Sequence, residues 1–232
     1  MPMSDAAELA AMRQRFPKLP PLTAAFQAFA ILATNAYLLY LLLQGEATPT
    51  SFALYGVLEL VAWSVIANTA LIPVPKALRV GSPDMPLPGR IMAIVAVSAL
   101  LGGIAWMSVP DRADAERLLQ ARDPLAALRE LHIVWPLLAT TALAAFGSIG
   151  DLLRWRRSGG PFVTGTAMAA AAKILTAIVA PIAAAFMSHG AADAARRAFV
   201  WTCVYLAIKS AAELLMLAWQ SLGMPERKSG RG

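Results

Sequence analysis

Residues 198–222 read AFVWTCVYLAIKSAAELLMLAWQSL, an apolar stretch in which Lys209 and Glu213 are the only charged side chains. The hydrocarbon core of a bilayer is about 30 Å thick, and a helix needs about 20 apolar residues to cross it. This stretch is long enough and apolar enough to do so. It therefore predicts a transmembrane helix.

Five further apolar runs of similar length precede it. Residues of the AVILMFWYC set make up 58% of the 232 residues and charged residues 15%, against about 45–50% and about 25% in soluble domains. Solid apolar runs predict helices, because an open sheet cannot satisfy its edge groups in lipid. The sequence thus predicts an all-α, polytopic transmembrane bundle of six spans, at residues 22–43, 52–72, 91–109, 133–153, 162–187 and 198–222.

The remaining segments are short. We expect residues 1–21 to be a cytoplasmic N-terminal segment with a short amphipathic helix, and residues 223–232 to be a flexible basic tail. Between spans three and four, residues 110–132 form an amphipathic segment on the outer surface, where Asp123 can cap a helix that Pro124 begins. A small lid over a cavity between the helices is the alternative for this segment.

The distribution of basic residues predicts the orientation. With a cytoplasmic N-terminus, the inner segments carry twelve Lys and Arg residues and the outer segments six. Cytoplasmic loops carry the excess of Lys and Arg in membrane proteins. Both termini are therefore expected in the cytoplasm. The protein itself is expected in a membrane of the bacterial inner or plasma type.

Several function classes find no support in the sequence. With one cysteine and two histidines, there is no cluster with metal-ligand spacing, and no cofactor motif is present. No nucleic-acid module is visible, and the cytoplasmic segments are too short for a catalytic domain. We expect neither an enzyme nor a nucleic-acid partner, and the first partner to be the lipid bilayer.

The candidate functional residues are polar side chains inside the spans. A charge at a helix centre costs roughly 2.5–3.5 kcal/mol on insertion scales, so such groups are expected to point inward and pair. The spans contain two lysines and two glutamates, so the net charge in the hydrocarbon zone is zero. Judged by position along each run, Glu59 lies toward the outside and Glu213 toward the inside. The predicted intramembrane polar site consists of Glu59, Lys173, Lys209, Glu213, Asn35 and Tyr205.

Two functions fit these residues. In the first, the charged interior binds or translocates a small ionic solute or protons. In the second, the charges are structural salt bridges in a non-catalytic scaffold or subunit, which packs against a membrane-protein partner or a second copy of itself. Direct pairing at roughly 2.7–3.2 Å with no cavity would favour the scaffold, whereas separated charges around a water-accessible pocket would favour transport.

Overall fold

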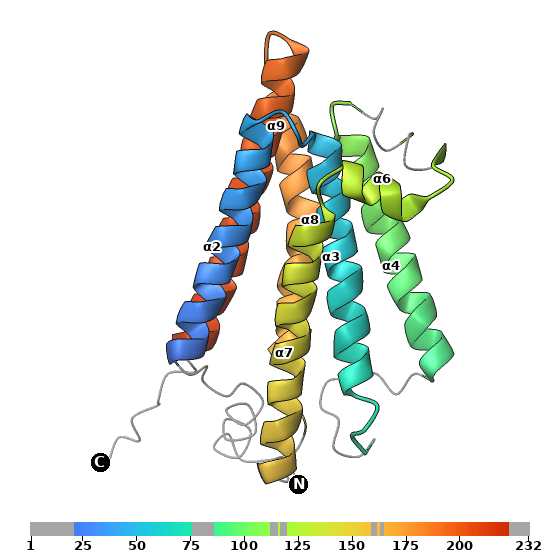
Figure 1. Cartoon of the computed structure of the whole chain (residues 1–232), viewed down its shortest axis with the longest axis vertical. Helices are drawn as coiled ribbons and strands as arrows, with labels where there is room; N and C mark the ends of the chain where they lie inside the picture. Colours follow the sequence, from blue (N-terminus) through green and yellow to red (C-terminus); the bar gives the residue numbers. More distant parts are fainter. Residues whose placement is uncertain are drawn as a thin grey trace, which may run out of the picture.

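The computed structural model of the 232-residue chain describes residues 21–75, 86–111, 116, 120–158, 162 and 165–222. The predicted N-terminal segment, apart from residue 21, and the predicted C-terminal tail lie outside these residues. The regular elements of the described part are helices (Figure 1). They are α2 (Pro21–Leu43), α3 (Pro49–Ala70), α4 (Leu87–Ser108), α6 (Pro124–Glu130), α7 (Val134–Ser158), α8 (Gly165–Ser188) and α9 (Ala194–Leu222).

The six long helices form an antiparallel bundle. Along the chain they alternate in direction, so that the start of α2 and the end of α9 lie at the same end of the molecule (Figure 1). The helix α9 packs against α8 and α2, and α3 packs against α4, α7 and α8. The helices α3, α8 and α9 therefore bring their polar residues into one interior.

The outer surface of the bundle is apolar. Large side chains such as Phe29, Phe146 and Leu215 are 70–71% exposed, and contiguous apolar surface of this kind marks contact with a membrane or a partner. Five helices, α2, α3, α4, α7 and α9, are long and apolar enough to cross a membrane. The chain is thus built as a membrane-embedded helical protein.

The helix α8 stands apart from these five. It is 24 residues long. Among the described residues, its apolar stretch is Thr176–Ser188, which is shorter than the five candidate spans. The sixth span consequently stays a prediction. Other helices extend beyond the apolar runs, as α7 does to Ser158, because the backbone hydrogen bonds of a helix are satisfied internally in water as well as in lipid.

The connection between α2 and α3 is tightly specified. Gly45 has a φ of 74°, and the N–H groups of Glu46 and Gly45 donate to the carbonyls of Leu41 and Leu42, which is the Schellman arrangement that ends a helix. Thr48 then caps α3 through a capping box with Ser51. The left-handed conformation of Gly45 thus ends α2 just after Leu43.

Replacing Thr48 by alanine removes the side-chain acceptor of the Ser51 N–H and the capping box with it. We expect the free energy of unfolding to fall by about 1 kcal/mol. Reversible denaturation in mixed micelles measures the loss, and Thr48→Ser, which keeps the hydroxyl, is the matched control. A Thr48→Ala variant as stable as the wild type would show that the cap contributes nothing.

The short helix α6 lies at the end of the bundle opposite the start of α2 (Figure 1). As predicted, Asp123 is its N-cap and accepts from the N–H groups of Leu125 and Ala126. Leu128 and Leu131 pack against the main apolar core, which ties this segment to the helices.

That core occupies one half of the bundle. Its buried side chains come mainly from the second half of α2 and the first halves of α3 and α9, among them Leu38, Leu41, Phe52, Trp201 and Tyr205, with others from the second halves of α4 and α8. Trp201 Nε1 donates to the Ser108 carbonyl at 2.9 Å. The half that contains α6 is therefore closed by packed aromatic and aliphatic side chains.

Candidate functional site

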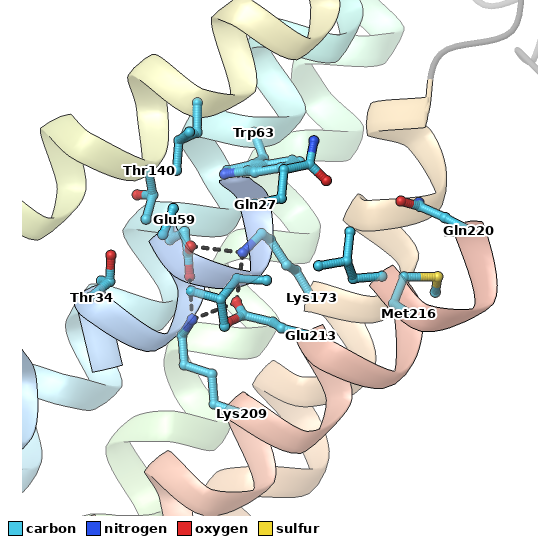
Figure 2. Close-up of a pocket in the computed structure, with 14 residues that line it drawn as sticks. Gln27, Thr34, Glu59, Trp63, Thr140, Lys173, Lys209, Glu213, Met216 and Gln220 are labelled. Carbon is cyan, nitrogen blue, oxygen red and sulfur yellow. Dashed lines mark hydrogen bonds and ion pairs between the residues drawn. The ribbon is translucent and has the colours of Figure 1, made fainter. Parts of the chain in front are cut away.

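Four ionisable side chains meet in the interior of the bundle. Lys173 Nζ lies 2.7 Å from Glu59 Oε1 and 2.8 Å from Glu213 Oε1. Lys209 Nζ lies 3.2 Å from Glu59 Oε2 and 2.5 Å from Glu213 Oε1. Each charge thus has two partners of opposite sign, and we call this closed set the ion-pair ring (Figure 2).

Three helices supply the ring. Glu59 comes from α3, Lys173 from α8, and Lys209 and Glu213 from successive turns of α9, where an i,i+4 spacing places two side chains on one face. Their side chains are 3%, 11%, 4% and 9% exposed, respectively. The ring is largely buried, and with all four groups ionised it carries no net charge, so each buried charge is compensated by its partners.

Two aromatic rings flank the lysines. Lys173 Nζ lies 4.7 Å from the ring centre of Trp63, and Lys209 Nζ lies 5.5 Å from that of Tyr55. Both distances fall within the range of cation–π attraction. Since Tyr55, Glu59 and Trp63 are spaced four residues apart on α3, one face of this helix meets both ammonium groups.

A pocket of about 100 Å³ reaches all four members of the ring. A water molecule takes about 30 Å³ of liquid volume, so this space can hold a few waters or one small solute. In Figure 2, Trp63 lies beside Lys173 of the ring, and Gln220 lies farther from the ring. The lining residues are Gln27, Ala30, Ile31, Thr34, Glu59, Trp63, Thr140, Leu143, Lys173, Lys209, Glu213, Met216, Leu217 and Gln220.

The pocket lies on one side of the ring only. It extends toward Gln27, near the start of α2, and Gln220, two residues before the end of α9. On the other side of the ring, Tyr55 and Tyr205 belong to the packed core. Among the described residues, the pocket therefore extends from the ring toward one end of the bundle, and packed core side chains lie between the ring and the other end.

The remaining two predicted site residues do not line this pocket. Asn35 is buried, and neither its amide nitrogen nor its amide oxygen has a hydrogen-bond partner. Tyr205 stacks on Trp201 with ring centres 5.2 Å apart, and its hydroxyl lies against Gly56. Tyr205 thus belongs to the core.

The sequence analysis missed Trp63, Gln27, Gln220 and the two threonines of the pocket wall. Helical spacing could have identified Trp63, because it follows Glu59 by four residues on α3. Thr34 and Gln27 share a face of α2 at a spacing of seven. Neutral polar residues are common in spans, so beyond such spacing the sequence carried no signal for the neutral polar residues of the pocket wall.

The described residues contain no group of three or more His, Cys, Asp or Glu side chains that could hold a metal ion. Comparisons with protein-family models, with curated proteins and with solved structures gave no match. Fold and site together define a membrane-embedded helical bundle with a neutral ion-pair ring at the closed end of a small pocket.

Proposed function

We propose that this protein binds a small ionic solute in the pocket, at the ion-pair ring, as a step in moving that solute or a proton across the membrane. The observation that carries the proposal is that one pocket reaches all four charged side chains. Packing alone does not need these charges, because small residues suffice to hold helices together in lipid.

The asymmetry of the bundle supports this proposal. A carrier exposes its site to one side of the membrane at a time, with the other side closed. Here the pocket extends toward one end of the bundle, and the aromatic core fills the other. On the proposed topology, with both termini cytoplasmic and six spans, the pocket faces the cytoplasm of a bacterial-type inner or plasma membrane.

The scaffold hypothesis is favoured by a different observation. The ring is complete without a ligand, since direct contacts of 2.5–3.2 Å join each lysine to both glutamates. The charges would then specify how α3, α8 and α9 pack, and an exposed outer face would meet a membrane-protein partner or a second copy. The pocket would have no role in this case, which makes the pocket the feature to test.

Filling the pocket with a bulky side chain separates the two hypotheses. Ala30 lines the pocket and Ala33, three residues later on α2, is exposed on the outside. Full-length protein in nanodiscs is mixed with sodium formate, sodium acetate or methylammonium chloride, and a ligand of the folded state raises the melting temperature. We expect at least one probe to do so. Its apparent affinity should fall at least tenfold in Ala30→Phe and stay unchanged in Ala33→Phe.

Flux into proteoliposomes that contain the same variants provides the second readout. The effective probe should enter faster than into protein-free vesicles, and Ala30→Phe should remove the difference. Absence of any shift or flux for anionic and cationic probes alike would refute the solute site and leave the scaffold hypothesis.

A further inference from the structure

The pocket wall presents hydrogen-bond donors that have no acceptor. The indole nitrogen of Trp63 is buried and has no hydrogen-bond partner, and an indole N–H can only donate. Two of the three N–H bonds of the Lys173 ammonium donate to Glu59 and Glu213, which leaves one. Because Lys173 Nζ lies 4.7 Å from the Trp63 ring centre, the two donors lie close together on the pocket wall (Figure 2).

A buried donor without an acceptor is costly, and a ligand that supplies the acceptor removes this cost. Three of the four carboxylate oxygens of the ring, in contrast, contact lysines: both oxygens of Glu59 and Oε1 of Glu213. A cation entering the pocket would approach two ammonium groups. At the ring, the donors without an acceptor include the indole N–H of Trp63 and one N–H of Lys173, and this favours an anion over a cation.

We propose that the solute is a small univalent oxyanion of the size of a short-chain carboxylate, bound beside Lys173 and Trp63, and that it enters together with one proton. This inference rests on the proposed function and names its substrate class. The volume of about 100 Å³ sets the size limit, and an oxyanion can accept from Lys173 and from Trp63 at the same time.

The proton follows from charge balance. The ring has zero net charge, so a univalent anion bound beside it leaves one uncompensated negative charge in a region of low dielectric constant, which is strongly unfavourable. One proton taken from solution and bound to a ring carboxylate restores neutrality. Glu213 is the carboxylate that takes it, because both glutamates line the pocket and the side chain of Glu213 is the more exposed, at 9% against 3% for Glu59.

The pH response depends on a small set of groups. The ionisable side chains around Glu213 are Glu59 and Tyr55 from α3, Lys173 from α8, and Lys209 and Tyr205 from α9. From α2 and α7 the pocket receives only neutral side chains. More protons are bound in the liganded state than in the free state, so by linkage the affinity for the anion rises as the pH falls.

The test measures formate binding and proton uptake on the full-length protein in nanodiscs. Sodium formate, adjusted to the pH of a weakly buffered sample, is added in the presence of a pH indicator, with sodium chloride as the control for ionic strength. We expect about one proton to be taken up per formate bound, and the formate-induced rise in melting temperature to be larger at mildly acidic than at mildly alkaline pH.

Trp63→Phe keeps an aromatic ring beside Lys173 and removes the N–H. Loss of one hydrogen bond to a charged ligand should weaken formate binding about tenfold. Trp135→Phe is the matched control, because Trp135 is 71% exposed and lies outside the pocket. In Glu213→Gln the side chain is neutral at every pH, so formate should bind with no proton uptake and with an affinity that no longer rises toward acidic pH.

The outcomes separate this inference from the proposed function. If methylammonium binds and formate does not, or if Trp63→Phe binds formate like the wild type, the oxyanion site is wrong while a solute pocket remains. Formate binding without proton uptake by the wild type overturns the coupled proton. If no probe of either sign binds, the proposed function itself fails.

Discussion

Replacing Lys209 by methionine is expected to lower the free energy of unfolding by about 3–5 kcal/mol, because removal of one member of a buried ion pair leaves its partners uncompensated. Lys209 contacts Glu59 at 3.2 Å and Glu213 at 2.5 Å. Without it, one ammonium group faces two carboxylates, and the ring acquires a net charge of −1. Reversible denaturation in mixed micelles at neutral pH measures the loss.

The matched control removes one charge of each sign. In the double variant Lys209→Met/Glu59→Gln, the pair of Lys173 and Glu213 remains, at 2.8 Å, and the interior is neutral again. Replacing a complete buried pair by neutral groups is often close to neutral in stability, so the double variant should recover most of the loss. If Lys209→Met alone is as stable as the wild type, the four groups are not all ionised in the folded protein.

The double variant also bears on function. If the ring is only structural, the neutral double variant should behave like the wild type in both the stability and the binding measurements. If the ring is part of a solute site, the double variant folds and yet loses solute binding, because half of the charged groups at the pocket are gone. Stability and binding measured on the same sample therefore distinguish the two proposals.

Introducing a methyl group at Gly56 is expected to destabilise the protein by about 1–3 kcal/mol, the usual cost of overpacking a core. A Cβ atom at this position would overlap the hydroxyl oxygen of Tyr205. Tyr205 is buried and stacked on Trp201, so its ring cannot move aside at low cost. The close approach of α3 and α9 at this point therefore requires glycine.

Two further variants test this explanation. Tyr205→Phe removes the hydroxyl and leaves the ring carbon Cζ at 3.5 Å from the new Cβ, an ordinary contact, so Gly56→Ala/Tyr205→Phe should be more stable than Gly56→Ala alone. A methyl group added at Gly102 would meet open space, and Gly102→Ala should be neutral or slightly stabilising, as alanine is the better helix former. Equal losses at Gly56 and Gly102 would contradict the steric explanation.

Much of the fold could be predicted from hydropathy. The bilayer acts on each segment separately, so the length and polarity of one run are enough to predict a helix there, and five of the six runs correspond to helices fit to span a membrane. Helix ends were predictable where local chemistry determines them, as at Gly45 and Asp123. Runs of small residues carry a weaker signal, and for α8 the span stays a prediction.

The pairing of the charges was predictable for a similar reason. An unpaired charge in hydrocarbon is so costly that two lysines and two glutamates must find each other in almost any bundle. The depth of each residue was less predictable. Glu59 and Glu213 were placed toward opposite faces of the membrane, yet both contact Lys173, because the stagger of α3 against α9 depends on packing along their whole length.

The sequence by itself determined that the chain is helical and apolar on its outside, because these are properties of single segments. It also determined that the few interior charges balance, because their balance is a sum over residues. Tertiary structure alone decided that the charges close into one ring, that Trp63 stands beside Lys173 with an unsatisfied N–H, and that a pocket reaches the ring from one end. Those features arise from the rotation and spacing of several helices at once, and no single run of residues encodes them.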